Sequence, residues 1–166
     1  MAATYEKIAT TTLGSAASSI NFTSISSAYT DLRIVWVFQA VSAGSNAGLR
    51  FNSDTGNNYS YTAITGTGST TVSQRGTSNN QCYFMANSTA ATSQLQIFQT
   101  DVFSYAGSTY KTLLTTYSGD LNGSGEVSSI VNLWRSTSAV TSVTLLFDAG
   151  NMTAGTTATL YGILKA

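Results

Sequence analysis

Apolar side chains recur along this chain at every second position. The clearest run, over residues 31–41, places four of them on one face of an extended segment: Leu32, Ile34, Trp36 and Phe38. A second run, over residues 142–148, repeats the alternation with Val143, Leu145 and Phe147. A period of two is typical of a strand that turns one face to a core, and a helix would show a period of 3.6.

Similar short runs, rich in Thr, Val, Ile and aromatic residues, predict about ten strands in all. They lie near residues 4–13, 19–25, 31–41, 47–53, 58–65, 81–87, 94–103, 109–117, 127–134, 142–148 and 157–164. The first two are either separate strands or one bent strand. Residues 86–93 are the one stretch in which we expect a short helical turn.

Clusters of Gly, Ser and Asn separate the predicted strands, and these residues favour turns. They occupy residues 42–48, 54–58, 66–80, 119–125 and 149–155. The stretch 66–80 is long and polar, so we expect a loop there that is either mobile or ordered by a partner. The pattern predicts an all-β fold: a single domain over residues 1–166, built as a β-sandwich or jelly roll of about ten antiparallel strands.

The composition argues against catalysis. The chain has no His and only seven basic and seven acidic residues, whereas Ser and Thr number 51 and aromatic residues 18. A Ser nucleophile needs a base, usually His. A glycosidase needs two carboxylates that face each other, and no local pattern of Asp and Glu residues indicates such a pair. We therefore predict a protein that is not an enzyme, with no catalytic, cofactor-binding or metal-binding residues and no cofactor.

The distribution of charge limits the partners. The seven basic residues are scattered and the net charge is zero, so we expect no nucleic-acid partner, because phosphate contacts dominate that affinity. No apolar run approaches the 18 residues of a membrane span, and residues 1–8 lack the features of a signal peptide. The lone Cys82 cannot form a disulfide within the chain.

Three groups of residues suggest possible binding sites, and each group also has a purely structural explanation. Asp120, Asn122 and Ser124 match the first ligands of a calcium loop, but its twelfth position is Val131 instead of a carboxylate, so we favour a hairpin turn. Asp54 and Asn57 suggest a polar pocket for a sugar or a cation, and again a turn is favoured.

Aromatic and Arg residues form the remaining group. Aromatic faces stack on sugars, yet Trp36 lies on an apolar strand face and is expected in the core, whereas Trp134 is expected at a rim. Arg33, Arg50 and Arg135 are candidate interface anchors, since Arg is favoured at interfaces, and each is equally compatible with a solvated strand position.

Five segments, read in order, resemble a family of small bacteriophage virion proteins that includes tail-fibre, tail and capsid-associated members. These are residues 25–32 (ISSAYTDL), 49–59 (LRFNSDTGNNY), 105–111 (YAGSTYK), 133–143 (LWRSTSAVTSV) and 154–163 (AGTTATLYGI). The resemblance implies a non-catalytic β-sandwich or jelly roll on a phage particle, as a homotrimer. It implies that residues 29–31 start a central strand, residues 54–56 shape a turn and residues 161–163 belong to the closing strand.

Our first hypothesis is a capsid decoration or cement protein that binds and stabilises the assembled shell. We expect the chain to be complete over residues 1–166 and to lack a fibre shaft. A small compact module of this kind suits binding at the repeated lattice points of a capsid shell. Its partners would be further copies of itself and the major capsid protein or other virion proteins. It would reside in the virion, assembled in the host bacterial cytoplasm.

Two alternatives remain open. One is a tail, baseplate or fibre-tip component, in which residues 66–80 and the aromatics would face a host glycan. The other is a carbohydrate-binding module outside any virus.

Overall fold

The regular structure of this chain consists entirely of β-strands in the residues that the computed structural model describes, 4–84 and 90–164. The strands are β1 (Tyr5–Thr12), β2 (Ser19–Phe22), β3 (Asp31–Phe38), β4 (Ala47–Phe51), β5 (Tyr59–Gly66), β6 (Thr71–Asn79), β7 (Cys82–Tyr83), β8 (Gln96–Val102), β9 (Lys111–Gly119), β10 (Glu126–Trp134), β11 (Val143–Phe147) and β12 (Thr157–Ile163). No helix within those two ranges is long and apolar enough to cross a membrane.

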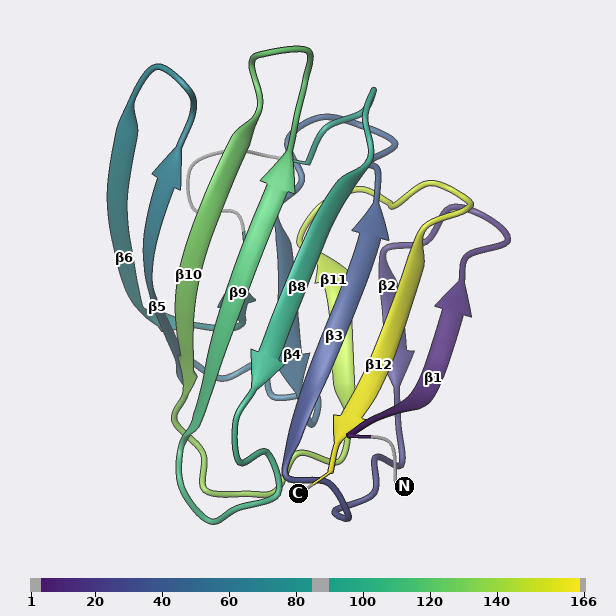
Figure 1. Cartoon of the computed structure of the whole chain (residues 1–166), viewed down its shortest axis with the longest axis vertical. Helices are drawn as coiled ribbons and strands as arrows, with labels where there is room; N and C mark the ends of the chain where they lie inside the picture. The colour runs from purple at the N-terminus through teal and green to yellow at the C-terminus, as the bar shows by residue number, and fades with distance from the viewer. Residues whose placement is uncertain (1–3, 85–89, 165–166) are drawn as a thin grey trace.

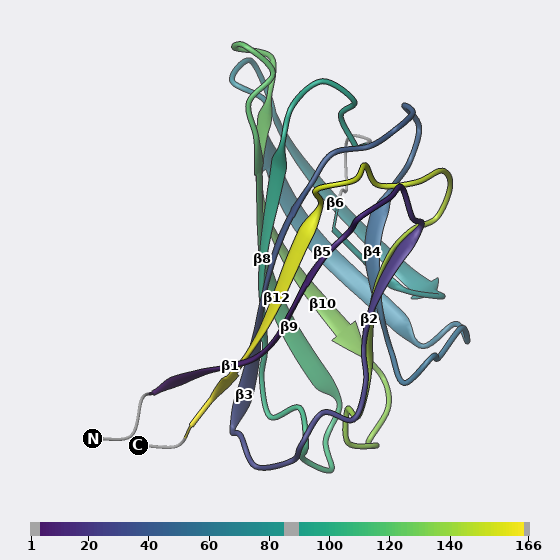
Figure 2. The ribbon, with the colours of Figure 1, turned by 90° about the vertical axis from the view of Figure 1, so that its right-hand side faces the viewer.

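Two antiparallel sheets pack against each other. The large sheet has eight strands in the order β1-β12-β3-β8-β9-β10-β5-β6, and the small sheet has four in the order β2-β11-β4-β7. Figure 1 looks onto the large sheet, from β6 at the left to β1 at the right, and Figure 2 shows the two layers from the side. The prediction of an all-β sandwich of antiparallel strands is confirmed.

Aromatic side chains join the two layers at the core. Trp36 and Phe38 of β3 lie against Phe98 of β8, with ring centroids 5.8 and 5.3 Å from it. Phe147, from β11 of the small sheet, meets Phe38 edge-on at 5.4 Å. The alternation read from residues 31–38 is therefore correct, because its apolar face is buried in one hydrophobic cluster contributed by both sheets.

The first two predicted strands are not one bent strand. β1 pairs with β12 at an edge of the large sheet, whereas β2 pairs with β11 in the small sheet. Residues 13–18, between the two strands, carry the chain from one layer to the other.

The polar stretch 66–80 is a strand for most of its length, which corrects the expectation of a long loop. β6 pairs with β5 after a turn in which Thr67 N donates to Thr70 O at 3.0 Å. β6 is an edge strand whose side chains are exposed or partly exposed throughout. It therefore lacks the alternation of apolar residues that reveals a half-buried strand.

Residues 82–93 include two further features considered in the sequence analysis, the lone Cys82 and the expected helical turn. Cys82 of β7 is buried and free, and burial raises the pKa of its thiol well above the ordinary value. Of the short helical turn expected at 86–93, residues 90–93 are not helical and residues 86–89 lie outside the described residues.

Of the three positions that the family resemblance implies, two agree with the structure and one agrees in part, because Tyr29 and Thr30 precede the strand that begins at Asp31. β3 begins at Asp31 and lies between β12 and β8, and the closing strand β12 contains residues 161–163. Residues 54–56 lie in the turn between β4 and β5.

Candidate functional site

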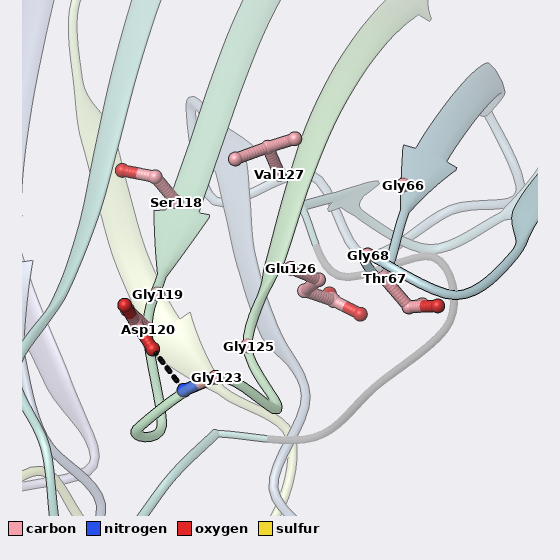
Figure 3. A pocket seen from close by; sticks show the side chains of 10 residues that line it. All are labelled: Gly66, Thr67, Gly68, Ser118, Gly119, Asp120, Gly123, Gly125, Glu126 and Val127. Carbon is pink, nitrogen blue, oxygen red and sulfur yellow. Dashed lines mark hydrogen bonds between the residues drawn. The ribbon is translucent and has the colours of Figure 1, made fainter.

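The hairpin between β9 and β10 contains Asp120, Asn122 and Ser124, the residues compared with a calcium loop. Asp120 Oδ1 accepts a hydrogen bond from Gly123 N at 2.8 Å, as Figure 3 shows. Ser124 Oγ donates to Leu121 O at 3.0 Å. Asn122 and Gly123 both have left-handed backbones, with φ of 60° and 86°, a conformation that Gly and Asn adopt most readily. The interpretation of this segment as a hairpin turn is confirmed.

A pocket of about 350 Å³ opens between this hairpin and the β5–β6 turn (Figure 3). Half of its lining is glycine, and its two carboxylates are Asp120 and Glu126. Within the described ranges, no three His, Cys, Asp or Glu side chains gather as a metal site would need. The sequence favours a turn here over a cation site, and the turn geometry leaves the expectation that Asp120, Asn122 and Ser124 hold no metal untested.

Asp54 belongs to a turn that anchors one sheet to the other. Its carboxylate accepts hydrogen bonds from Gly56 N at 2.8 Å, Asn58 Nδ2 at 2.9 Å and Trp134 Nε1 at 2.7 Å. Burial raises the pKa of Asp54, but the bonds from Trp134, Asn58 and Gly56 outweigh it, so the pKa lies below its usual value. Asp54 follows β4 and Trp134 ends β10, so this bond spans the two layers.

This arrangement confirms the turn at residues 54–58 and corrects the placement of Trp134. Trp134 is 2% exposed and packs on Phe51, with ring centroids 5.3 Å apart. It is a core residue and not a rim residue. Trp36 is buried, as predicted.

The three arginines proposed as interface anchors are each bonded within the chain. Arg33 forms a two-pronged pair with Asp101, at 2.6 and 2.8 Å, and this hydrogen bond raises the pKa of Arg33. Arg50 Nε donates to Asn80 O at 3.0 Å, and Arg135 donates to the carbonyl of Asn57. These bonds leave the interface prediction untested.

Lys111 carries a buried amine, a group that can act as a nucleophile or as the base of a Ser–Lys pair when its pKa is lowered. Its side chain is fully buried at the start of β9, and burial lowers its pKa. Nζ donates to the carbonyl oxygens of Gly107, at 2.7 Å, and Thr109. Neither partner is a hydroxyl, so this arrangement is not a Ser–Lys pair and serves to fix the connection from β8 to β9.

A polar recess of about 580 Å³ lies on the outer face of the small sheet. Pairing across this sheet aligns Ser19 of β2, Leu146 of β11, Gly48 of β4 and Tyr83 of β7 in one row. Most of the lining is polar, and it comprises Ser18, Ser19, Arg50, Asn80, Gln81, Tyr83, Thr144, Leu146, Phe147 and Asp148.

Gln81 is the unusual member of this recess. It is 1% exposed, and neither Nε2 nor Oε1 of its amide has a hydrogen-bond partner among residues 4–84 and 90–164. The amide lies over Gly48, where an added Cβ would come within 2.7 Å of Gln81 Nε2. Only glycine leaves this space, so the sheet is indented where the amide sits.

Other residues of the recess are held in place by neighbouring elements. Tyr83 N and O are both bonded to the Asn132 side chain of β10, at 3.1 Å each. Asp148 accepts bonds from Asn46 N at 2.8 Å and Asn46 Nδ2 at 2.7 Å. The recess thus combines a fixed frame with one unsatisfied amide, and sequence reasoning identified neither Gln81 nor Gly48.

Comparisons with known proteins identify no family. No family model matches the chain, and no curated protein matches its sequence. Among solved structures, the crystal structure of galectin LEC-6 from Caenorhabditis elegans aligns with 94% of this chain and 96% of the galectin chain, at 10% identity and a TM-score of 0.39. A likeness this low carries no argument about function.

Proposed function

We propose that this chain is a non-enzymatic structural protein of a bacteriophage virion, a decoration or cement protein that binds and stabilises the assembled capsid. The outer face of the large sheet is the observation that supports it most. The resemblance of five sequence segments to phage virion proteins supports the same assignment.

That outer face carries a continuous apolar patch. Val131 of β10 pairs with Leu114 of β9, and Ile64 of β5 pairs with Ser129, which places Ile64 diagonally next to both Val127 and Val131. We call Ile64, Leu114, Val127 and Val131 the outer patch. Ile64, Val127 and Val131 are 54, 63 and 46% exposed. Exposed apolar patches of this kind mark interaction surfaces.

The face around the outer patch is nearly free of charge. In β8, β9, β10 and β5, Asp101 is the one charged side chain on the outer face, and Arg33 of the neighbouring strand neutralises it. Beside the patch, the edge strand β6 adds one exposed positive charge, Arg75, which pairs with Thr62 of β5. Charged residues are depleted at the centres of protein interfaces. A sheet face with exposed apolar side chains and few charges suits contact with a protein shell better than contact with phosphate or with solvent alone.

Stabilisation would follow from mass action. A protein that binds only the assembled shell adds its binding free energy to the shell. A homotrimer would present three such faces, and their linkage would strengthen contacts that are individually weak. Light scattering tests the trimer, and a monomer at micromolar concentration would contradict it.

Rupture of virions with and without the protein tests the cementing role. Particles that carry the protein are expected to survive higher temperature and stronger osmotic shock. Equal rupture thresholds would contradict the proposal.

The polar recess favours a second candidate, a tail, baseplate or fibre-tip component that binds a host surface glycan. The copy number per particle separates the two: a decoration protein is present in hundreds of copies and a tail protein in a few to tens. A carbohydrate-binding module outside any virus is the third candidate, and absence of the protein from purified virions would favour it.

A further inference from the structure

From the unpartnered Gln81 amide, we infer that the recess on the small sheet is a binding site for a single neutral sugar residue. This assignment does not depend on whether the protein sits on a capsid or a tail.

The first step concerns the amide itself. A buried side-chain amide without a partner is unfavourable, and such groups are rare in native proteins. Gln81 leaves both its donor and its acceptor unsatisfied, although it lies in the wall of a recess large enough for a small ligand. A ligand that supplies both partners would remove this cost.

The second step concerns the shape of the site. Gly48 has no side chain, and the Gln81 amide fills the indentation that this leaves. Across the strands, Leu146 lies on one side of Gly48 and Tyr83 on the other, while Arg50 is two residues further along β4. Tyr83 and Arg50 are partly exposed and line the recess together with Gln81. The Tyr83 ring contacts the ring of Tyr61, with centroids 5.8 Å apart, and Arg50 Nε donates to Asn80 O, so both side chains are held at the edge of the site.

The third step identifies the ligand class. An amide presents N–H donors beside a C=O acceptor, and adjacent hydroxyls of a sugar ring complement both at once. Arg50 offers further donors, Ser18 and Ser19 offer hydroxyls, and the Tyr83 ring offers an aromatic face.

The charges that line the recess favour a neutral ligand. The guanidinium of Arg50 and the carboxylate of Asp148 both line the recess. Their charges offset each other, so an anion gains little there. A hydroxylated neutral ring therefore fits the lining better than a phosphate or a carboxylate does.

The test is an NMR titration of the full chain with a panel of neutral monosaccharides, namely hexoses, deoxyhexoses and N-acetylhexosamines. It follows the Gln81 side-chain NH₂ signals and the backbone amides of β4, β7 and β11. At least one sugar is expected to shift these signals saturably, while the signals of the large sheet's outer face stay in place.

Gln81→Leu is the decisive variant, because it keeps the side chain close to its volume and removes the amide. It is expected to weaken binding of the responding sugar by about tenfold or more. Gln99→Leu is the matched control, since Gln99 is exposed on the outer face of the large sheet, and it should bind the sugar as the unaltered chain does.

Four results would overturn the inference. They are no saturable shift with any sugar of the panel, an equal response in Gln81→Leu, a response to sodium sulfate in place of the sugars, and a long-lived water on the Gln81 amide with no sugar response. In the last case, a structural water would satisfy the amide.

Discussion

The large sheet turns outward a broad, almost uncharged surface with exposed Ile, Leu and Val side chains, whereas the outer face of the small sheet is indented at Gly48 and lined by polar groups. The two faces cover the same hydrophobic core. A surface with exposed apolar side chains favours a large protein partner, and a recess with an unsatisfied amide favours a small hydroxylated one. One sandwich can therefore hold two independent contact surfaces, each with its own chemistry.

The core shared by both faces gives the largest expected effect. Phe98→Ala removes a ring that packs against Trp36, Phe38, Phe84 and Tyr117. The variant should lose about 3–5 kcal/mol of unfolding free energy in urea denaturation. Association with particles and sugar binding should both decrease. A loss of unfolding free energy well under about 1 kcal/mol would show that the two faces do not depend on this cluster.

The link between the two sheets comes next. Asp54→Asn removes the carboxylate to which Trp134 Nε1 donates a hydrogen bond. The variant should lose about 1–3 kcal/mol of unfolding free energy at pH 7. Because the pKa of Asp54 is lowered in the folded protein, its stabilisation is fully present above the unfolded pKa of about 3.9 and is lost as the pH falls through the folded value.

Urea denaturation from pH 6 to pH 2 measures this dependence. The unaltered chain should lose stability below about pH 4, and Asp54→Asn should lose less over the same interval. Identical acid dependence of the two proteins would remove Asp54 from this role.

The outer patch is expected to give a smaller and more selective effect. Val131→Lys places a charge at its centre and should reduce association with particles by about tenfold or more, equivalent to about 1.4 kcal/mol. Unfolding free energy should change by less than about 1 kcal/mol, because the side chain is exposed.

Thr55→Lys adds the same charge at an exposed turn away from both faces and should associate normally. Co-sedimentation with particles stripped of the protein measures the difference. If both variants bind alike, the outer patch is not the contact surface.

The smallest effect is expected at Gln81, and a second buried glutamine, Gln96, provides the comparison. Gln96 donates to Tyr117 OH at 2.9 Å and accepts from Ala91 N at 3.0 Å, whereas the Gln81 amide has no partner. Gln96→Leu should therefore lose about 1–3 kcal/mol of stability. Gln81→Leu should keep its stability or gain up to about 1 kcal/mol. Equal losses in thermal melts would mean that Gln81 has a partner in solution.

Most of the fold was predictable because most strands are half-buried. The alternation at residues 31–38 and 143–147 records one face on the core, and the structure has strands at both places. The sequence does not predict β6, because every side chain of this edge strand is exposed or partly exposed. Such a strand shows no alternation of apolar and polar residues. The turn at residues 54–58 was identified from its Asp, Gly and Asn residues, which bond their own backbone.

The recess could not be predicted in the same way. Gln81 and Gly48 are far apart in sequence, and only the pairing of β4 with β7 brings them together. Nor does the sequence reveal that Trp134 is buried, because its contacts with Phe51 and Asp54 join positions that are far apart in the chain. Local pattern indicates which residues form strands, but the register between distant strands decides which side chains meet.

Electron cryomicroscopy of virions that carry the protein tests the central claim most directly. We expect copies at repeated points of the shell, with Ile64, Val127 and Val131 against the capsid and the Gln81 recess open to solvent. Copies confined to the tail, or copies whose outer patch faces solvent while the recess lies against the shell, would contradict it.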